Sequence, residues 1–166
     1  MNDLPRIKSV APQGGAQLRI LWADGRQNLV DLTGWIARGR PDLAALQDPQ
    51  RFAVVEIVDW GATLQWPPEE DDLTIDAHHL ALLADEQRPF LSTDLVAWQD
   101  RLGLSNQEAA DMFGIALSTW SGYRSGSTIP AAIAMACRSA ERDPILLEAR
   151  FRPRRAGRPK KVAAGA

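Results

Sequence analysis

The stretch Ser105–Pro130, SNQEAADMFGIALSTWSGYRSGSTIP, constrains the fold more than any other part of the chain. Its apolar residues recur at helical spacing on both sides of Gly114, which permits a sharp turn because glycine has no Cβ. The small side chain of Ala110 would let a second helix lie close across the first. Trp120 and Tyr123, three residues apart, define the buried face of that second helix. The sequence therefore predicts two short helices joined by a tight turn.

The run GIALSTWSGYRSG, from Gly114 to Gly126, is followed by Pro130 and resembles the helix-turn-helix of the Cro and phage-repressor type. The run departs from that family at Trp120, where a β-branched residue is usual, and at Arg124, where glutamate is usual. The resemblance implies a lambda-repressor-like domain of five helices in a bacterial transcription regulator. The second helix of the motif, residues 117–124, would lie in the major groove of double-stranded DNA. An ordinary helical hairpin with a glycine turn is the alternative.

The outward face of this second helix is plain. Ser118 and Thr119 can each donate or accept a hydrogen bond, and Leu117 could touch a thymine methyl group. Gln, Asn and Arg, which form bidentate contacts with single bases, are missing from the outward positions of this helix. We therefore expect modest sequence specificity, shared with DNA shape and with a second subunit of a homodimer.

Further helices are expected around this pair. Leu95 and Trp98 share a face of a preceding helix, for which Ser92 or Thr93 is the predicted cap. Pro130 is expected in the first turn of a following helix. Another helix would start at Asp143-Pro144. The resemblance to repressors implies that these helices form one all-α domain over residues 89–151.

The first half of the chain reads as a small antiparallel sheet packed against one short helix, so the fold class is α+β. Asp24-Gly25 is a hairpin turn signal, Thr33 is a possible cap of a helix over Leu32–Arg38, and Pro67-Pro68 should end the sheet. A later helix, Asp76–Glu86, would be capped by Asp76. The predicted strands are Arg6–Val10, Gln17–Trp22, Gln27–Leu32, Phe52–Val58 and Ala62–Trp66.

This half also resembles a small bacterial domain of unknown function that occurs alone or ahead of helix-turn-helix modules. The resemblance rests on the DG hairpin, on VDL at Val30–Leu32, and on the VDWG, WP and DL motifs between Val58 and Leu73. These motifs look structural, so the resemblance implies a fold and no activity. We place the domain boundary at Gln87-Arg88-Pro89, which gives a first domain over residues 1–88 with an unknown ligand or protein partner.

Composition limits the class of protein. The chain has 166 residues, of which 45% are hydrophobic, including six tryptophans, so it can bury a sizeable core. It has no apolar run near the ~20 residues that cross a bilayer, and its start lacks the apolar core of a signal peptide. A single cysteine agrees with a reducing cytoplasm, where we expect the protein to act without membrane contact.

Charge is divided unevenly along the chain. All 21 acidic residues and 12 of the 19 basic residues precede Arg150, which leaves a net charge of −9 there. The remaining seven basic residues lie within 150–161. Residues 90–149 alone carry a net charge of −3 and should bind DNA poorly, because affinity for the duplex depends on phosphate neutralisation. We expect the basic tail, residues 152–166, to supply that neutralisation.

Within the tail, Gly157-Arg158-Pro159 and its flanking lysines look like an AT-hook, an arm that lies in the minor groove of A·T-rich DNA. A full hook has arginine where this chain has Ala156. A plain basic tail that binds phosphates is the alternative. The predicted DNA-binding residues are Asn106, Gln107, Leu117, Ser118, Thr119, Ser121, Gly122, Arg124, Arg154, Arg155, Arg158, Lys160 and Lys161.

Other functions find less support in the sequence. The acidic run Glu69–Asp72 and the pair His78-His79 suggest a metal site, but adjacent helical residues point about 100° apart and cannot readily share one ion. Cys137 reads as a core residue. We expect no metal, cofactor or catalytic residue, and hence no enzyme. The alternative function is a protein-interaction or antitoxin-like adaptor whose helix-turn-helix no longer reads DNA.

Overall fold

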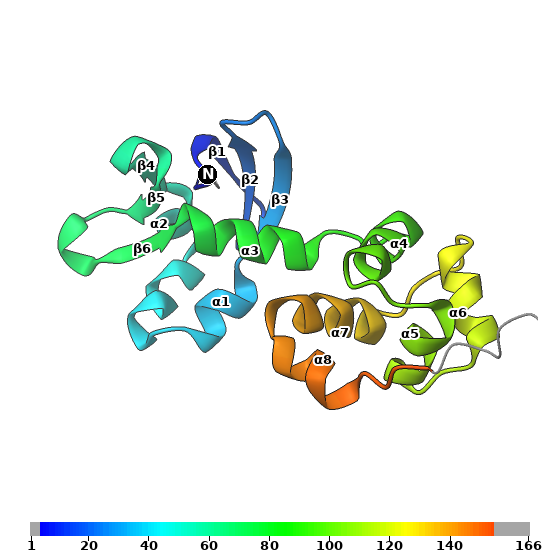
Figure 1. Cartoon of the computed structure of the whole chain (residues 1–166). Helices are drawn as coiled ribbons and strands as arrows, with labels where there is room; N and C mark the ends of the chain where they lie inside the picture. Colours follow the sequence, from blue (N-terminus) through cyan, green and yellow to red (C-terminus); the bar gives the residue numbers. More distant parts are fainter. Residues whose placement is uncertain (1–3, 155–166) are drawn as a thin grey trace, which may run out of the picture. The chain divides into compact units, whose positions relative to one another are not determined.

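A computed structural model describes residues 4–154 of the chain, which divides into two compact units on either side of the Arg88–Pro89 bond (Figure 1). The first unit mixes helix and sheet, and the described part of the second is helical, so the chain is α+β. No helix among residues 4–154 is both long enough and apolar enough to cross a membrane.

The first unit contains two three-stranded antiparallel sheets, with strand orders β1-β2-β3 and β4-β5-β6. The Asp24-Gly25 turn joins β2 to β3 as predicted, with Leu18 opposite Val30 in the register. The strands are β1 (Ile7–Gln13), β2 (Gln17–Trp22), β3 (Gln27–Asp31), β4 (Glu56–Val58), β5 (Thr63–Trp66) and β6 (Leu73–Asp76).

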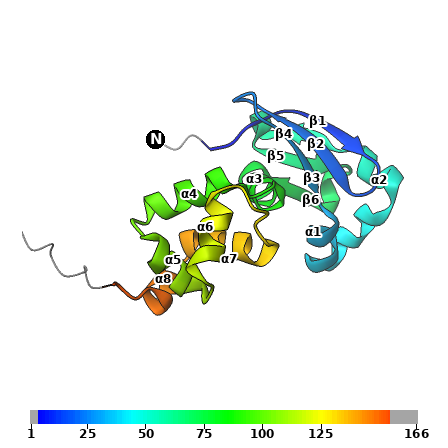
Figure 2. The same ribbon diagram turned by 90° about the vertical axis from the view of Figure 1, so that its right-hand side faces the viewer.

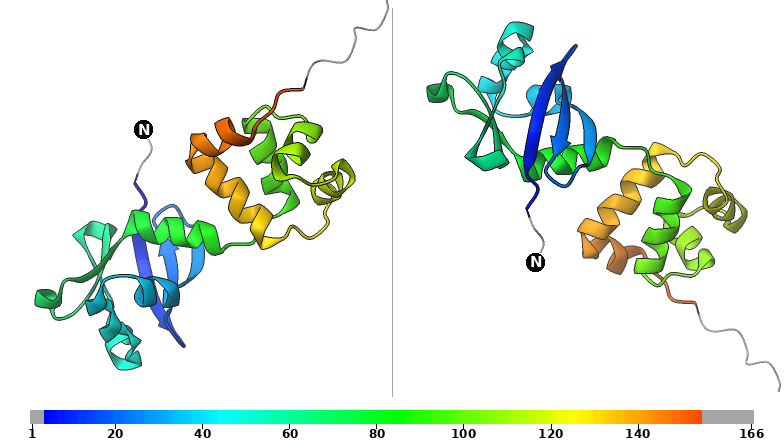
Figure 3. Two further views of the ribbon diagram at one scale, coloured as in Figure 1. Left: turned by 90° about the horizontal axis from the view of Figure 1, so that it is seen from below. Right: turned by 90° about the horizontal axis from the view of Figure 1, so that it is seen from above.

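The helices of the first unit cover the sheets and close its core. The helix α3 contacts both β3 and β6 (Figures 1 and 3), and Asp76 caps it by accepting a hydrogen bond from the His79 N–H at 2.8 Å. Alternating buried residues such as Leu18 and Ile20 point from the strands into the core. The helices are α1 (Thr33–Arg38), η1 (Pro41–Gln47), α2 (Pro49–Ala53), η2 (Asp59–Gly61), η3 (Glu69–Asp71) and α3 (Ala77–Gln87).

The predicted strand Phe52–Val58 is wrong over its first half, where the chain forms the end of α2. Asp48 accepts a hydrogen bond from the Gln50 N–H, and Pro49 occupies the first turn, so two local start signals favour a helix. The buried Phe52 ring then packs on Trp66 with a centroid separation of 5.7 Å. Only the last three residues of the predicted strand, β4, pair with β5.

Two further expectations for this unit are wrong. Pro67-Pro68 does not end the sheet, because β6 returns and pairs with β5 beyond it. Thr33 is the first residue of α1 and not its cap. Its backbone N–H instead donates to Asp31 Oδ1 at 2.8 Å. The single small sheet expected from the sequence is therefore two sheets.

The described part of the second unit consists of helices (Figure 2). They pack around a core that includes Trp98, Trp120 and Cys137. Ser92 lies inside the first helix and does not cap it, since its hydroxyl donates to the Tyr123 carbonyl at 2.6 Å. Pro130 was expected in the first turn of a helix, but it occupies the cap position just before that helix. The helices are α4 (Ser92–Arg101), α5 (Asn106–Phe113), α6 (Leu117–Arg124), α7 (Ala131–Arg142) and α8 (Pro144–Arg150).

Candidate nucleic-acid interface

The pair α5–α6 forms as the sequence predicts, with a tight turn between two eight-residue helices. Ser105 and Glu108 make a capping box at the start of α5, so two backbone N–H groups find side-chain acceptors. Gly114 ends α5 in the left-handed region at φ 66°, which glycine adopts without steric cost. Ala110 is fully buried and belongs to the same core cluster as Trp120 of α6.

The buried face of α6 is fixed by aromatic packing. Trp120 has no exposed surface, and its ring stacks on Phe113 with a centroid separation of 5.4 Å. Trp98 lies against both rings, 6.1 Å from Trp120 and 5.7 Å from Phe113. Because these rings come from α4, α5 and α6, they set the position of α6 on the two helices before it.

Gln99, on α4, is a buried polar residue that joins the same helices. Its Oε1 accepts hydrogen bonds from Trp120 Nε1 at 2.8 Å and from Arg124 Nη1 at 2.6 Å. Its Nε2 donates to the Leu104 carbonyl at 2.8 Å and to Asn106 Oδ1 at 3.0 Å. Tryptophan and arginine only donate, so the chemistry of its partners permits only this orientation of the Gln99 amide.

The same logic orients Asn106, the first residue of α5. Because Gln99 Nε2 is a donor, the atom of Asn106 that faces it must be the oxygen, and Asn106 Nδ2 is turned away. This Nδ2 makes no hydrogen bond within residues 4–154, and Asn106 is exposed. Asn106 therefore offers two N–H groups at the surface beside the start of α5.

The first three residues of α6, all predicted to bind DNA, are exposed, whereas the later predicted residues of this helix are less so. Leu117 is 41% exposed, and Ser118 and Thr119 are exposed as well, whereas Ser121 and Gly122 are half-buried. Ala116 occupies the cap position of α6 and provides no side-chain acceptor for the first N–H groups of this helix. The start of α6 thus combines uncapped backbone donors with neutral side chains.

Arg124 and Gln107, both predicted to bind DNA, make contacts within the helical unit. Arg124 is half-buried and donates to Gln99, as described above. Gln107 donates from Nε2 to Asp111 Oδ1 at 2.8 Å. Arg155, Arg158, Lys160 and Lys161, with the AT-hook-like segment, lie outside the described residues.

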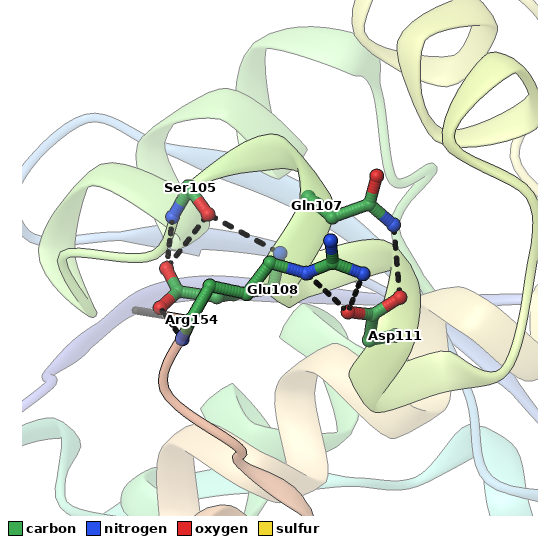
Figure 4. Close-up of polar contacts among 5 residues, drawn as sticks. All are labelled: Ser105, Gln107, Glu108, Asp111 and Arg154. Atoms are coloured by element: carbon green, nitrogen blue, oxygen red, sulfur yellow. Dashed lines mark hydrogen bonds and ion pairs between the residues drawn. The ribbon is translucent and has the colours of Figure 1, made fainter. Parts of the chain in front are cut away.

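Arg154 is held against α5 by two carboxylates (Figure 4). Its backbone N–H donates to Glu108 Oε1 at 3.0 Å, and its guanidinium donates to Asp111 Oδ2 from Nε at 2.9 Å and from Nη2 at 2.8 Å. The hydrogen bonds from Arg154 lower the pKa of the Asp111 carboxyl. Backbone and side-chain bonds from Ser105, together with the Arg154 N–H, lower the pKa of Glu108.

Neither the acidic run nor the histidine pair forms a metal centre in the described part of the chain, where no three His, Cys, Asp or Glu residues gather around a common point. Asp72 pairs with Arg40 at 3.1 Å, and Asp71 pairs with Arg51. These ion pairs were not foreseen from the sequence. Burial raises the pKa of the Cys137 thiol to about 12, so this core cysteine is a poor nucleophile.

The role of Gln99 was not predicted from the sequence. A glutamine at a position next to Trp98 on the inner helix face was the available signal, because a polar residue there must find partners in the core. Its partners lie up to 25 residues away in the chain and could not be named from spacing alone.

The chain is similar to the protein in a crystal structure described as a "Putative DNA Binding Protein" from Nitrosomonas europaea. The two share 29% sequence identity over 95% of this chain and 100% of the other, with a TM-score of 0.48. Neither a protein-family model nor a curated protein sequence matches the chain.

Proposed function

We propose that this protein is a DNA-binding transcription regulator in which α5 and α6 form a helix-turn-helix and the C-terminal tail adds phosphate contacts. The observation that carries the proposal is the division of α6 into two faces. Trp120 and the Gln99 hydrogen bonds fix one face, while Leu117, Ser118 and Thr119 stand exposed on the other. In this proposal the protein binds and does not catalyse.

On this proposal the start of α6 enters the major groove. The hydroxyls of Ser118 and Thr119 meet base edges, and Leu117 lies against a thymine methyl group. Single hydroxyls discriminate bases less than bidentate side chains do, so sequence selectivity is modest. Asn106 donates its Nδ2 hydrogens to a phosphate, which fixes the register of the helix without reading sequence.

The helical unit needs an external source of positive charge for this role. Residues 90–149 have a net charge of −3, and Arg124 is directed at Gln99. The basic segment 150–161 supplies the phosphate neutralisation, whether it enters the minor groove or only follows the backbone.

A salt series tests the tail. Duplex affinity of the full chain should fall steeply with salt, and removal of residues 152–166 should reduce the slope of log K against log salt by up to about 5, because six basic residues are lost. Fluorescence anisotropy with a labelled mixed-sequence duplex measures both. An unchanged slope would exclude the tail as the source of affinity.

A charge placed on α6 tests the reading face. Ser118→Glu should weaken duplex binding at least tenfold, because a carboxylate would face phosphates and base edges. Ala97→Glu is the matched control, since Ala97 is an exposed residue of α4 and receives the same charge. Equal weakening by both variants would argue against α6 as the bound element.

We also propose a homodimer, since a two-fold pair of α6 helices would read two half-sites and raise a modest selectivity. Exposed apolar side chains are present on α7 and α8, with Met135 61% and Ile145 62% exposed. Sedimentation velocity with and without duplex measures the stoichiometry. A single chain bound per duplex at saturation would rule the dimer out.

The acidic balance of residues 90–149 favours one other function, an adaptor that binds a protein through the same helices. In that case the full chain would not bind genomic fragments in a gel-shift experiment, its own promoter included. The first unit would then be the place to seek a protein partner or a small ligand.

A further inference from the structure

Glu108 and Asp111 form a prepared receptor on the surface of α5. Ser105 holds Glu108 through Oε2, with its N–H at 2.9 Å and its hydroxyl at 2.7 Å, and this leaves Oε1 free. Gln107 holds Asp111 through Oδ1 and leaves Oδ2 free. One oxygen of each carboxylate is thus fixed by α5 or its cap, and the other points to the same site (Figure 4).

Arg154 fills this receptor with both its backbone and its side chain. The backbone N–H takes the free oxygen of Glu108, and the guanidinium takes the free oxygen of Asp111 with two donors. A backbone contact and a two-donor arginine contact fix the direction of the chain as well as its position. The same guanidinium cannot meet a DNA phosphate without giving up Asp111.

The contact determines which residue is the last one held on the helical unit. Among residues 4–154, Phe151 is the last one that packs against the apolar core of the helical unit. Without this contact, Arg154 would be restrained only by its three-residue link to Phe151 and could move over about 10 Å. With this contact, Arg154 lies beside α5, the helix that begins with Asn106.

We infer that Glu108 and Asp111 anchor Arg154 so that the basic residues after it start next to the duplex. Arg154 is then a positioning residue and not a DNA contact. This inference rests on the proposed DNA-binding function. Tethering raises the effective concentration of the following cations near DNA without a new contact. Arg154 also offsets part of the negative charge that the two carboxylates place near Asn106.

The anchor predicts that Asp111→Asn weakens duplex binding only when the tail is present. In the full chain, Asp111→Asn should weaken binding of a labelled mixed-sequence duplex about two- to fivefold, the range expected for an exposed ion pair. In a chain that ends at Phe151, the same change should leave affinity unchanged or tighten it, because only a repelling charge is lost. The control is Asp100→Asn, at an exposed position of α4, which should change duplex affinity equally in the full and shortened chains.

A measurement without DNA tests the contact itself. In a carboxyl NMR titration of the full chain, Arg154→Gln should raise the pKa of Asp111 towards its ordinary value, whereas Arg152→Gln should not. An unmoved Asp111 pKa overturns the anchor. So does duplex binding that Asp111→Asn tightens equally in the full and shortened chains. If the unmodified chain binds no duplex even at low salt, the proposed function fails, and the role of the anchor on DNA fails with it.

Discussion

Two different kinds of contact hold the two sides of α5, buried hydrogen bonds on the inner side and an exposed ion pair on the outer side. On the inner side, the buried Gln99 amide makes four hydrogen bonds of fixed direction, which join the Leu104 carbonyl and Asn106 to Trp120 and Arg124. On the outer side, Arg154 lies in an exposed pair of carboxylates. A buried polar network is costly to break because its members cannot turn to water, whereas an exposed ion pair exchanges readily with water and salt. The inner side therefore sets the shape of the unit, and the outer side is free to serve binding.

The largest expected effect tests the inner side. Gln99→Leu should lower the free energy of unfolding by roughly 2–4 kcal/mol, because it leaves the Trp120 indole N–H and the Leu104 carbonyl without their partner in a buried site. Urea denaturation followed by tryptophan fluorescence measures it. Asp100→Asn, the exposed neighbour, should change stability by less than about 0.5 kcal/mol. A stable Gln99→Leu protein would mean that water or another side chain reaches these groups.

A smaller effect is expected at Ser105, where the inner and outer sides meet. Ser105→Ala removes the acceptor of the Glu108 N–H and should cost about 1 kcal/mol of stability. It also removes one of the two hydrogen bonds that hold Glu108 Oε2, so it should weaken the contact of Glu108 with Arg154. Ser118→Ala, an exposed serine of α6, is the matched control. Equal stability of the two variants would show that the cap contributes nothing.

The smallest effect on stability is expected on the outer side. The pKa of Asp111 is lowered in the folded chain, first by Arg154, so the contact stabilises the fold above the ordinary pKa of 3.8 and this contribution is lost as the pH falls through the lowered value. Arg154→Gln should therefore flatten the loss of stability between about pH 5 and pH 2, with Arg152→Gln as control. A change at pH 7 that persists in high salt would contradict a screened surface contact.

An element could be predicted from the sequence when the residues that determine it are close together in the chain. The pair α5–α6 was predictable because its signals are local: a capping box, a glycine turn and aromatic residues at helical spacing. Phe52–Val58 was misassigned because a run of β-branched residues outweighed Asp48-Pro49, the helix start just before it. The strand β6 is not predicted, because two consecutive prolines such as Pro67-Pro68 indicate the end of a sheet.

The candidate site was predictable in outline and not in its contacts. The exposed residues of α6 follow from helical periodicity around Trp120. The contacts of Gln99 and Arg154 do not, since they join residues up to 25 and 46 positions apart. Composition does not distinguish Arg154 from the other basic residues of the tail, because its contacts with Glu108 and Asp111 depend on the folded chain.

The fixed direction of the Gln99 amide has a consequence for exchanging parts between proteins. A helix grafted in place of α6 must bring a hydrogen-bond donor to both position 120 and position 124, because an acceptor at either one would face Gln99 Oε1. A graft that carries glutamate at position 124 would require a donor in place of Gln99. The helices α4 and α6 must therefore be exchanged together, and substitutions that keep this network must be confined to the exposed face of α6.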